Sequence, residues 1–285
     1  MVLTGRRWRR AAGIAVLTII TVFVCQLVAV RGIFAPSRSV LSVGGTAVLV
    51  GVQGHRMAGR AYLGSSPVPV SRLVVVIHGD APFVRPGYHY HFASALADRL
   101  PGTRVVAILR PGYADPYGGR SDGDRGFAVG DNYTRAFVDQ LAAAISLLRS
   151  RSPELGTMLV GHSGGAALSA DVALLYPGLV TRAFLVGCPC DVPAFRRHMA
   201  RAQWNPLWLV HVNSISPLQT LEGTQSRTSV IAISGSTDPI KLPEYAERYV
   251  SRARQLGMLA DMIVLPDRGH EILNDPAVLE RIGEG

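Results

Sequence analysis

Short apolar runs recur along the chain, and each ends at a glycine, a proline or a polar residue. The runs that we interpret as buried strands are residues 73–77, 104–109, 157–160, 183–186, 229–233 and 261–265. Continuous hydrophobicity of this kind is typical of strands covered on both faces of a parallel sheet. Two earlier β-rich runs, 46–52 and 57–63, flank turn residues that include Gly54, and they predict a hairpin.

Stretches with helical periodicity alternate with the apolar runs. They cover roughly residues 89–99, 133–151, 164–176, 243–257 and 276–282. Pro177 follows the third stretch and Pro243 opens the fourth, as is usual at helix ends. Strands that alternate with helices through short connections predict an α/β fold, with a mostly parallel twisted sheet and helices on both faces.

Two stretches interrupt this alternation. Residues 110–132 are rich in Gly, Pro and Asp and are too long for a plain turn, so we interpret them as a functional or lid-like loop whose Arg110 and Tyr113 are candidate pocket residues. Residues 188–228 predict a small insertion over the sheet. Within it, Trp204 and Trp208 are four apart, which predicts one helix face buried against the sheet.

The first 45 residues have a different character. Residues 11–30 contain no charged side chain, and a helix of that length is about 30 Å long, the thickness of a bilayer's hydrocarbon core. Four arginines precede this segment, so the positive-inside rule predicts a cytoplasmic basic segment at 1–10, a transmembrane signal anchor at 11–30, a linker at 31–45 and an extracytoplasmic domain at 46–285. The alternatives are a secreted protein whose signal peptide is cleaved and a buried core helix.

Composition narrows the class of protein. Hydrophobic residues make up 48% of the chain and charged residues 17%, enough apolar material for a sizeable core. The net charge of +9 comes from the N-terminal part, because no Asp or Glu precedes Asp80 and the two signs balance from there on. A neutral domain argues against a nucleic-acid-binding surface.

Gly161-His162-Ser163-Gly164-Gly165 matches the pattern G-x-S-x-G, between a predicted strand and a predicted helix. That context is the one in which the pattern marks a nucleophilic serine on a sharp turn. The glycines allow close approach of neighbouring backbone, and the helix N-terminus favours a developing oxyanion.

A serine nucleophile needs a base, and the base needs an acid that orients it. Asp238 follows the predicted strand 229–233, and His270 follows the last strand. Because the carboxyl ends of parallel strands meet at one edge of the sheet, we expect Ser163, Asp238 and His270 to converge there. The stretch after the first buried strand is expected to supply an oxyanion donor, so we assign the oxyanion hole to the N–H groups of Asp80 and Gly164.

Five segments together resemble the α/β-hydrolase superfamily over roughly residues 46–283. They are LVVVIHGD (73–80), RPGY (110–113), LVGHSGG (159–165), SGSTD (234–238) and RGH (268–270). The resemblance implies a serine hydrolase that forms an acyl-enzyme and uses no cofactor. One departure is Asp80, where many relatives carry a small or apolar residue. Its carboxylate either turns away, pairs with an arginine or binds a cationic group of the substrate.

The remaining His and Cys residues suggest no further chemistry. His78 and His162 are expected to be structural, and His89 and His91, two apart on a helix, do not share a face that could bind a metal. Cys188 and Cys190 are too close in sequence for an ordinary disulfide and are interpreted as two small side chains after a strand.

The function predicted from the sequence is therefore a membrane-anchored serine hydrolase that cleaves a small-molecule ester or an amide, with no metal and no nucleic-acid partner. One alternative is a serine peptidase with aminopeptidase-like activity, which Asp80 as an anchor for a substrate amine would favour. Others are acyl transfer to an alcohol and a non-catalytic binding protein on a hydrolase fold.

Overall fold

The computed structural model describes residues 43–65, 67–81, 83–126, 130, 132–150, 156–224 and 226–284, all within the unit Ser39–Gly285. The strands in this part of the chain are β1 Thr46–Val50, β2 Met57–Leu63, β3 Arg72–Ile77, β4 Thr103–Ile108, β5 Gly156–His162, β6 Arg182–Val186, β7 Ser229–Gly235 and β8 Ala260–Leu265. The helices are α2 Tyr88–Arg99, α3 Arg135–Ser150, α4 Gly164–Leu175, α5 Val192–Ala202, η1 Pro206–Leu209, α6 Pro217–Thr220, η2 Leu221–Gly223, α7 Pro243–Gln255 and α8 Pro276–Gly283.

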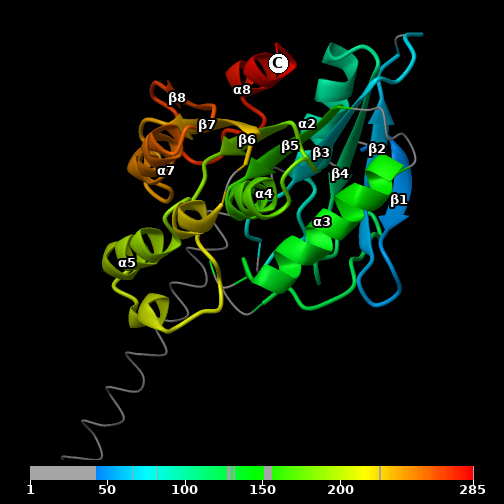
Figure 1. Ribbon diagram of the computed structural model, residues 1–285. Helices are drawn as coiled ribbons and strands as arrows, with labels where there is room; N and C mark the ends of the chain where they lie inside the picture. The colour runs from blue at the N-terminus through cyan, green and yellow to red at the C-terminus, as the bar shows by residue number, and fades with distance from the viewer. Residues whose placement is uncertain are drawn as a thin grey trace, which may run out of the picture. The chain divides into compact units, whose positions relative to one another are not determined.

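The strands form one mostly parallel sheet in the order β1-β2-β4-β3-β5-β6-β7-β8 (Figure 1). β1 and β2 are the predicted hairpin, and β2 also pairs antiparallel with β4. From β4 to β8 every pairing is parallel. The expected α/β fold with a mostly parallel sheet is therefore confirmed.

Side chains of the central strand β3 alternate between two apolar layers. Val75 belongs to the layer that contains the buried faces of α3, α4 and α7. Val74 belongs to the layer that contains α2 and α8. Because both faces are covered, β3 is apolar without a break after Arg72 and ends fully buried at Ile77. The loops that carry the predicted site residues follow the carboxyl ends of the strands.

Between β6 and β7 the chain forms α5, η1, α6 and η2, in the stretch interpreted as an insertion. The tryptophan prediction made for this stretch is wrong. α5 ends at Ala202, Pro206 starts a separate 3₁₀ turn, and Trp204 between them is 90% exposed. Four-residue spacing places two side chains on one face only within a continuous helix, and a proline ends such continuity.

No helix in the described ranges is both long and apolar enough to cross a bilayer. The predicted transmembrane segment 11–30, the basic segment 1–10 and most of the linker 31–45 lie outside the described residues.

Candidate active site

Ser163 lies on a sharp turn between β5 and α4. Its backbone has φ 54° and ψ −121°, a region that costs a non-glycine residue about 1–3 kcal/mol. The turn is held by the Ser163 N–H, which donates to the carbonyl of Val186 at 2.8 Å. Gly161 and Gly165 are required by packing, because a Cβ on either would lie within 2.4 Å of a backbone oxygen.

His270 lies between the other two predicted triad residues. Its Nε2 is 3.0 Å from the Ser163 Oγ, and its Nδ1 is 2.7 Å from Asp238 Oδ2. All three side chains are at least 95% buried. Residues more than 100 positions apart in the sequence are thus brought into one hydrogen-bonded chain at the carboxyl edge of the sheet.

Asp238 is held in its ionised form by several donors. Its Oδ1 accepts the N–H groups of Ile240 and Lys241, each at 2.8 Å. Burial raises the pKa of Asp238, but hydrogen bonding and charge interaction with His270, together with the two backbone donors, leave it below its usual value. An ionised Asp238 accepts a hydrogen bond from Nδ1–H of His270, which leaves Nε2 unprotonated and facing the serine hydroxyl.

Asp80 pairs with an arginine, one of the three arrangements considered from the sequence. Its Oδ1 accepts from Arg110 Nη1 at 2.8 Å, and its Oδ2 accepts from the Tyr133 hydroxyl. Burial raises the pKa of Asp80, but the charges of Arg110 and Lys241, together with the hydrogen bonds from Tyr133 and Arg110, leave it below its usual value, so the carboxyl is ionised. This buried ion pair removes Asp80 as an anchor for a substrate amine, so that argument for a peptidase is wrong.

The backbone near Asp80 adjoins the serine. A Cβ on Gly79 would be 2.8 Å from the Ser163 Cβ, and one on Gly164 would be 2.3 Å from Asp80 Oδ1. The first turn of α4 has no side-chain cap on its N–H groups. The predicted oxyanion residues Asp80 and Gly164 therefore lie against each other beside Ser163, at the positive end of a helix.

Tyr88, which the sequence analysis missed, connects this backbone to the loop that carries His270. Its hydroxyl accepts the Gly79 N–H at 2.7 Å and contacts His162 Nδ1 at 2.7 Å. The hydroxyl proton therefore points to Nδ1, so His162 carries its proton on Nε2, which lies 3.2 Å from the carbonyl of His270. Burial, followed by the neighbouring His270, lowers the pKa of His162 to about 3, so the ring stays neutral.

Two further buried groups have clear environments. His78 Nε2 accepts the Arg110 N–H at 3.0 Å, and its Nδ1–H donates to the Gly79 carbonyl at 2.7 Å, so His78 supports the loop. Lys241 has its Nζ 3.1 Å from the centroid of the Phe195 ring, with no hydrogen-bond partner in the described part of the chain. Burial lowers the pKa of Lys241 to about 7, although Asp80 and Asp238 oppose the shift.

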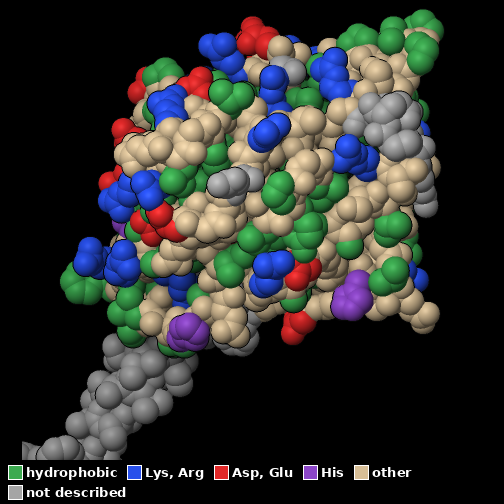
Figure 2. Space-filling model, in the orientation of Figure 1, with side chains coloured by type: hydrophobic (Ala, Val, Ile, Leu, Met, Phe, Trp, Pro, Cys, Tyr) green, Lys and Arg blue, Asp and Glu red, His purple; other side chains and the backbone are tan. Residues whose placement is uncertain are grey.

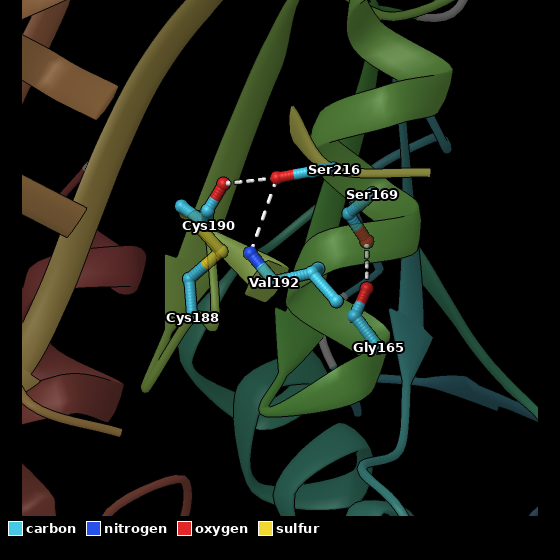
Figure 3. Close-up of a disulfide and its surroundings, with 6 residues drawn as sticks. All are labelled: Gly165, Ser169, Cys188, Cys190, Val192 and Ser216. Carbon is cyan, nitrogen blue, oxygen red and sulfur yellow. Dashed lines mark hydrogen bonds between the residues drawn. A yellow bond between two sulfur atoms is a disulfide. The ribbon is translucent and has the colours of Figure 1, made fainter. Parts of the chain in front are cut away.

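Cys188 and Cys190 form a disulfide directly after β6, contrary to the interpretation from the sequence (Figure 3). Their Cα atoms are 5.1 Å apart, within the range that a disulfide spans. Two extended residues would cover about 7 Å, so the backbone folds back here, which spacing alone does not reveal. Ser216 secures the loop, because its Oγ donates to the Cys190 carbonyl and accepts the Val192 N–H.

His89 is fully buried with both ring nitrogens unpartnered within the described residues, and burial lowers its pKa to about 3. His91 is only partly buried. The described residues contain no cluster of three or more His, Cys, Asp or Glu side chains arranged to hold a metal ion.

The family model for serine aminopeptidases of the S33 type matches residues 69–226, more than half of the chain. The match contains β3, the Ser163 turn and most of the insertion. The chain belongs to this family of α/β hydrolases. It is thus an enzyme that acts on ester or peptide bonds, which favours catalysis over the non-catalytic alternative. No curated protein matches the chain in sequence.

Solved structures share the fold at low sequence identity. An esterase from Pyrococcus furiosus is 16% identical with a TM-score of 0.63, and the alignment covers 87% of this chain and 94% of that one. Esterase PE8 is 18% identical with a TM-score of 0.58, covering 80% and 96%. An acylaminoacyl peptidase is 13% identical with a TM-score of 0.62, covering 83% of this chain and 39% of that one.

Proposed function

We propose that the protein is a membrane-anchored serine hydrolase that cleaves a carboxylic ester or amide through an acyl-enzyme. The observation that carries this proposal is the position of the His270 ring, with one nitrogen 3.0 Å from Ser163 Oγ and the other 2.7 Å from Asp238. A serine hydroxyl is a weak nucleophile, and it is activated by a base that is itself oriented by an acid, as in this row of hydrogen-bonded side chains.

In the proposed mechanism, the Ser163 Oγ bonds to the carbonyl carbon of the substrate while His270 Nε2 takes the hydroxyl proton. The carbonyl oxygen becomes an oxyanion that accepts hydrogen bonds from the N–H groups of Gly164 and Asp80. The carbon–heteroatom bond then breaks, and His270 returns the proton to the leaving alcohol or amine. A water molecule repeats these steps on the acyl-enzyme and releases the acid.

The test is labelling with a fluorophosphonate, which reacts with activated serines. We expect wild type to be labelled and the adduct to map to Ser163, and we expect Ser163→Ala and His270→Ala to lose both labelling and turnover by about 10⁴-fold or more. Thermal unfolding of each variant controls for folding. Unlabelled but folded wild-type protein would overturn the proposal.

A peptidase acting on free amino termini is the second candidate, and Glu271 is the observation that favours it. Glu271 directly follows His270 and is exposed, although partial burial of its carboxyl raises its pKa. With Asp80 buried, Glu271 is the carboxylate next to His270 that remains open to a substrate amine. If Glu271→Gln lowers the turnover of aminoacyl amides and leaves the turnover of p-nitrophenyl esters unchanged, the peptidase is favoured. If the substitution lowers neither turnover, the esterase is favoured.

We also propose that residues 11–30 remain as a membrane anchor and that the catalytic domain is extracytoplasmic. The charge pattern of the N-terminus supports this orientation. The Cys188–Cys190 disulfide supports export, because disulfides persist mainly in oxidising compartments. An intact mass that retains residue 1 and extraction only by detergent are expected; a mature N-terminus near residue 30 would support the secreted alternative instead.

A further inference from the structure

The insertion exposes an apolar surface that the proposed mechanism does not use. Trp204 is 90% exposed, Leu209 63%, Val210 57% and Leu207 53%. With Arg197 and Arg201 they form what we call the α5–η1 patch. Figure 2 shows hydrophobic and basic side chains side by side over this part of the molecule.

The patch surrounds a hollow and includes a strained residue. The hollow has a volume of about 460 Å³ and is lined by both arginines, Trp204, Leu209 and their neighbours Ala200 and Pro206. Trp204 has φ 51°, a conformation that bulky residues rarely adopt. The conformation of Trp204 costs free energy through the strained backbone and again through the exposure of a large apolar ring to water. Such outliers point to a function.

The charge of this segment selects the partner. Between Asp191 and Glu222, which pair with Arg248 and Arg252, the segment has no Asp or Glu and exposes Arg197 and Arg201. The two signs balance over the chain from Asp80 onward. Aromatic and aliphatic side chains beside arginines match the interfacial region of a bilayer that contains anionic headgroups. We propose that the α5–η1 patch docks the catalytic domain on an anionic lipid surface.

Two other occupants conflict with the charges. A second copy of the chain on a two-fold axis would place Arg197 and Arg201 against the same arginines. The N-terminal segment of the chain itself begins with four arginines, Arg6, Arg7, Arg9 and Arg10, which the patch would repel.

Tethering favours the docked state, a step that depends on the proposed membrane anchor. Residues 31–42 connect the segment 11–30 to the first described residue, and twelve residues span about 40 Å at most. A domain confined so close to a bilayer meets it at a high effective concentration, so a patch of modest affinity is sufficient. Docking would hold the domain at the lipid surface, where apolar esters concentrate.

The experiment uses the full chain in vesicles and the fluorescence of one tryptophan. The chain has tryptophans at 8, 204 and 208, so Trp8→Phe with Trp208→Phe leaves Trp204 as the only one. The matched control also carries Trp204→Phe and Leu259→Trp, because Leu259 is 72% exposed at the amino end of β8, the edge of the sheet opposite the serine. Labelling of Ser163 confirms that each variant is folded.

In vesicles of phosphatidylcholine and phosphatidylglycerol with brominated acyl chains, we expect Trp204 to be quenched at least about threefold more than the tryptophan at 259. Replacing Arg197 and Arg201 by Glu should reduce the quenching towards the control. Equal quenching of the two tryptophans would overturn the proposal. So would quenching that is unchanged when phosphatidylglycerol is omitted, or a shielded Trp204 in covalently cross-linked dimers.

Flotation of the same samples separates this proposal from the anchor. A chain that does not float with phosphatidylcholine vesicles has no working anchor, and docking is then measured as flotation that requires phosphatidylglycerol and is lost in Arg197→Glu with Arg201→Glu. A chain that floats without phosphatidylglycerol and regardless of these substitutions has a working anchor. If Trp204 is unquenched in that sample, the proposed docking surface is overturned while the anchor is retained.

Discussion

At the scale of single residues, Asp80 creates a conflict that its neighbours resolve. An ionised carboxylate beside an oxyanion opposes catalysis, and Asp80 adjoins both Gly164 and the serine turn. Arg110, whose side chain is fully buried, neutralises it at 2.8 Å. Removing one partner of such a pair leaves an unpaired buried charge, so Asp80 and Arg110 are expected to tolerate single substitution poorly.

The Tyr88 hydroxyl is a positioning group that can be removed without changing the shape of the core. We expect Tyr88→Phe to lower kcat by about 10–100-fold, because the Gly79 N–H loses its acceptor and His162 loses the donor that sets its tautomer. The measurement is steady-state kinetics on an ester substrate, with KM expected to change little.

Tyr249→Phe is the matched control for this prediction. Tyr249 is fully buried, whereas Tyr88 is partly buried, and the Tyr249 hydroxyl has no partner among the described residues. Its removal is expected to leave kcat unchanged. Equal rates for Tyr88→Phe and Tyr249→Phe would exclude a positioning role for Tyr88.

At the scale of elements, helix α4 contains a buried acid, Asp171, at a distance from Ser163 along the helix. Asp171 accepts a hydrogen bond from Thr220 of α6 through Oδ1, while Oδ2 has no partner among the described residues. Burial raises the pKa of Asp171 from 3.8 to about 8. The contact between the two helices therefore depends on a carboxyl that is protonated at neutral pH.

The sign of the resulting pH dependence follows from the raised pKa. The contribution of Asp171 to folding is complete below about pH 4, decreases as the carboxyl ionises in the unfolded chain, and is lost above about pH 8. We expect Asp171→Asn to raise the melting temperature by on the order of 5 °C at pH 9 and by less at pH 5. Melting curves over this range test it, with the exposed Asp98→Asn as control. A gain that does not grow with pH would contradict this assignment.

At the scale of the whole molecule, charge and chemistry occupy different parts of the chain. The basic excess lies before Asp80, whereas Ser163, Asp238 and His270 lie after it. The proposed orientation has the N-terminus inside and the domain outside, and it predicts that a membrane-impermeant fluorophosphonate labels Ser163 in intact cells as fully as in permeabilised ones. The control is the absence of labelling in Ser163→Ala. Labelling that requires permeabilisation would reverse the proposed orientation.

The local sequence pattern was sufficient to predict most helices and strands and the candidate site residues, because each prediction depends on a few neighbouring positions. Apolar runs predicted β3 to β8, and prolines predicted the start of α7 and the end of α4. The pattern G-x-S-x-G predicted a serine on a turn, since only glycine fits beside that backbone. The Trp204 prediction was wrong because spacing does not show where a helix stops.

The order of strands and helices, the G-x-S-x-G turn and the candidates Ser163, Asp238 and His270 were determined by the sequence itself, because hydrophobic periodicity and turn chemistry are local properties. Only the tertiary structure decided the pairing of Asp80 with Arg110, the Tyr88–His162 connection, the Cys188–Cys190 disulfide and the exposure of Trp204. Each of these depends on how the backbone folds in space or on which distant side chain shares a buried volume. That choice is made by packing and charge neutralisation, which leave no periodic signal in the chain.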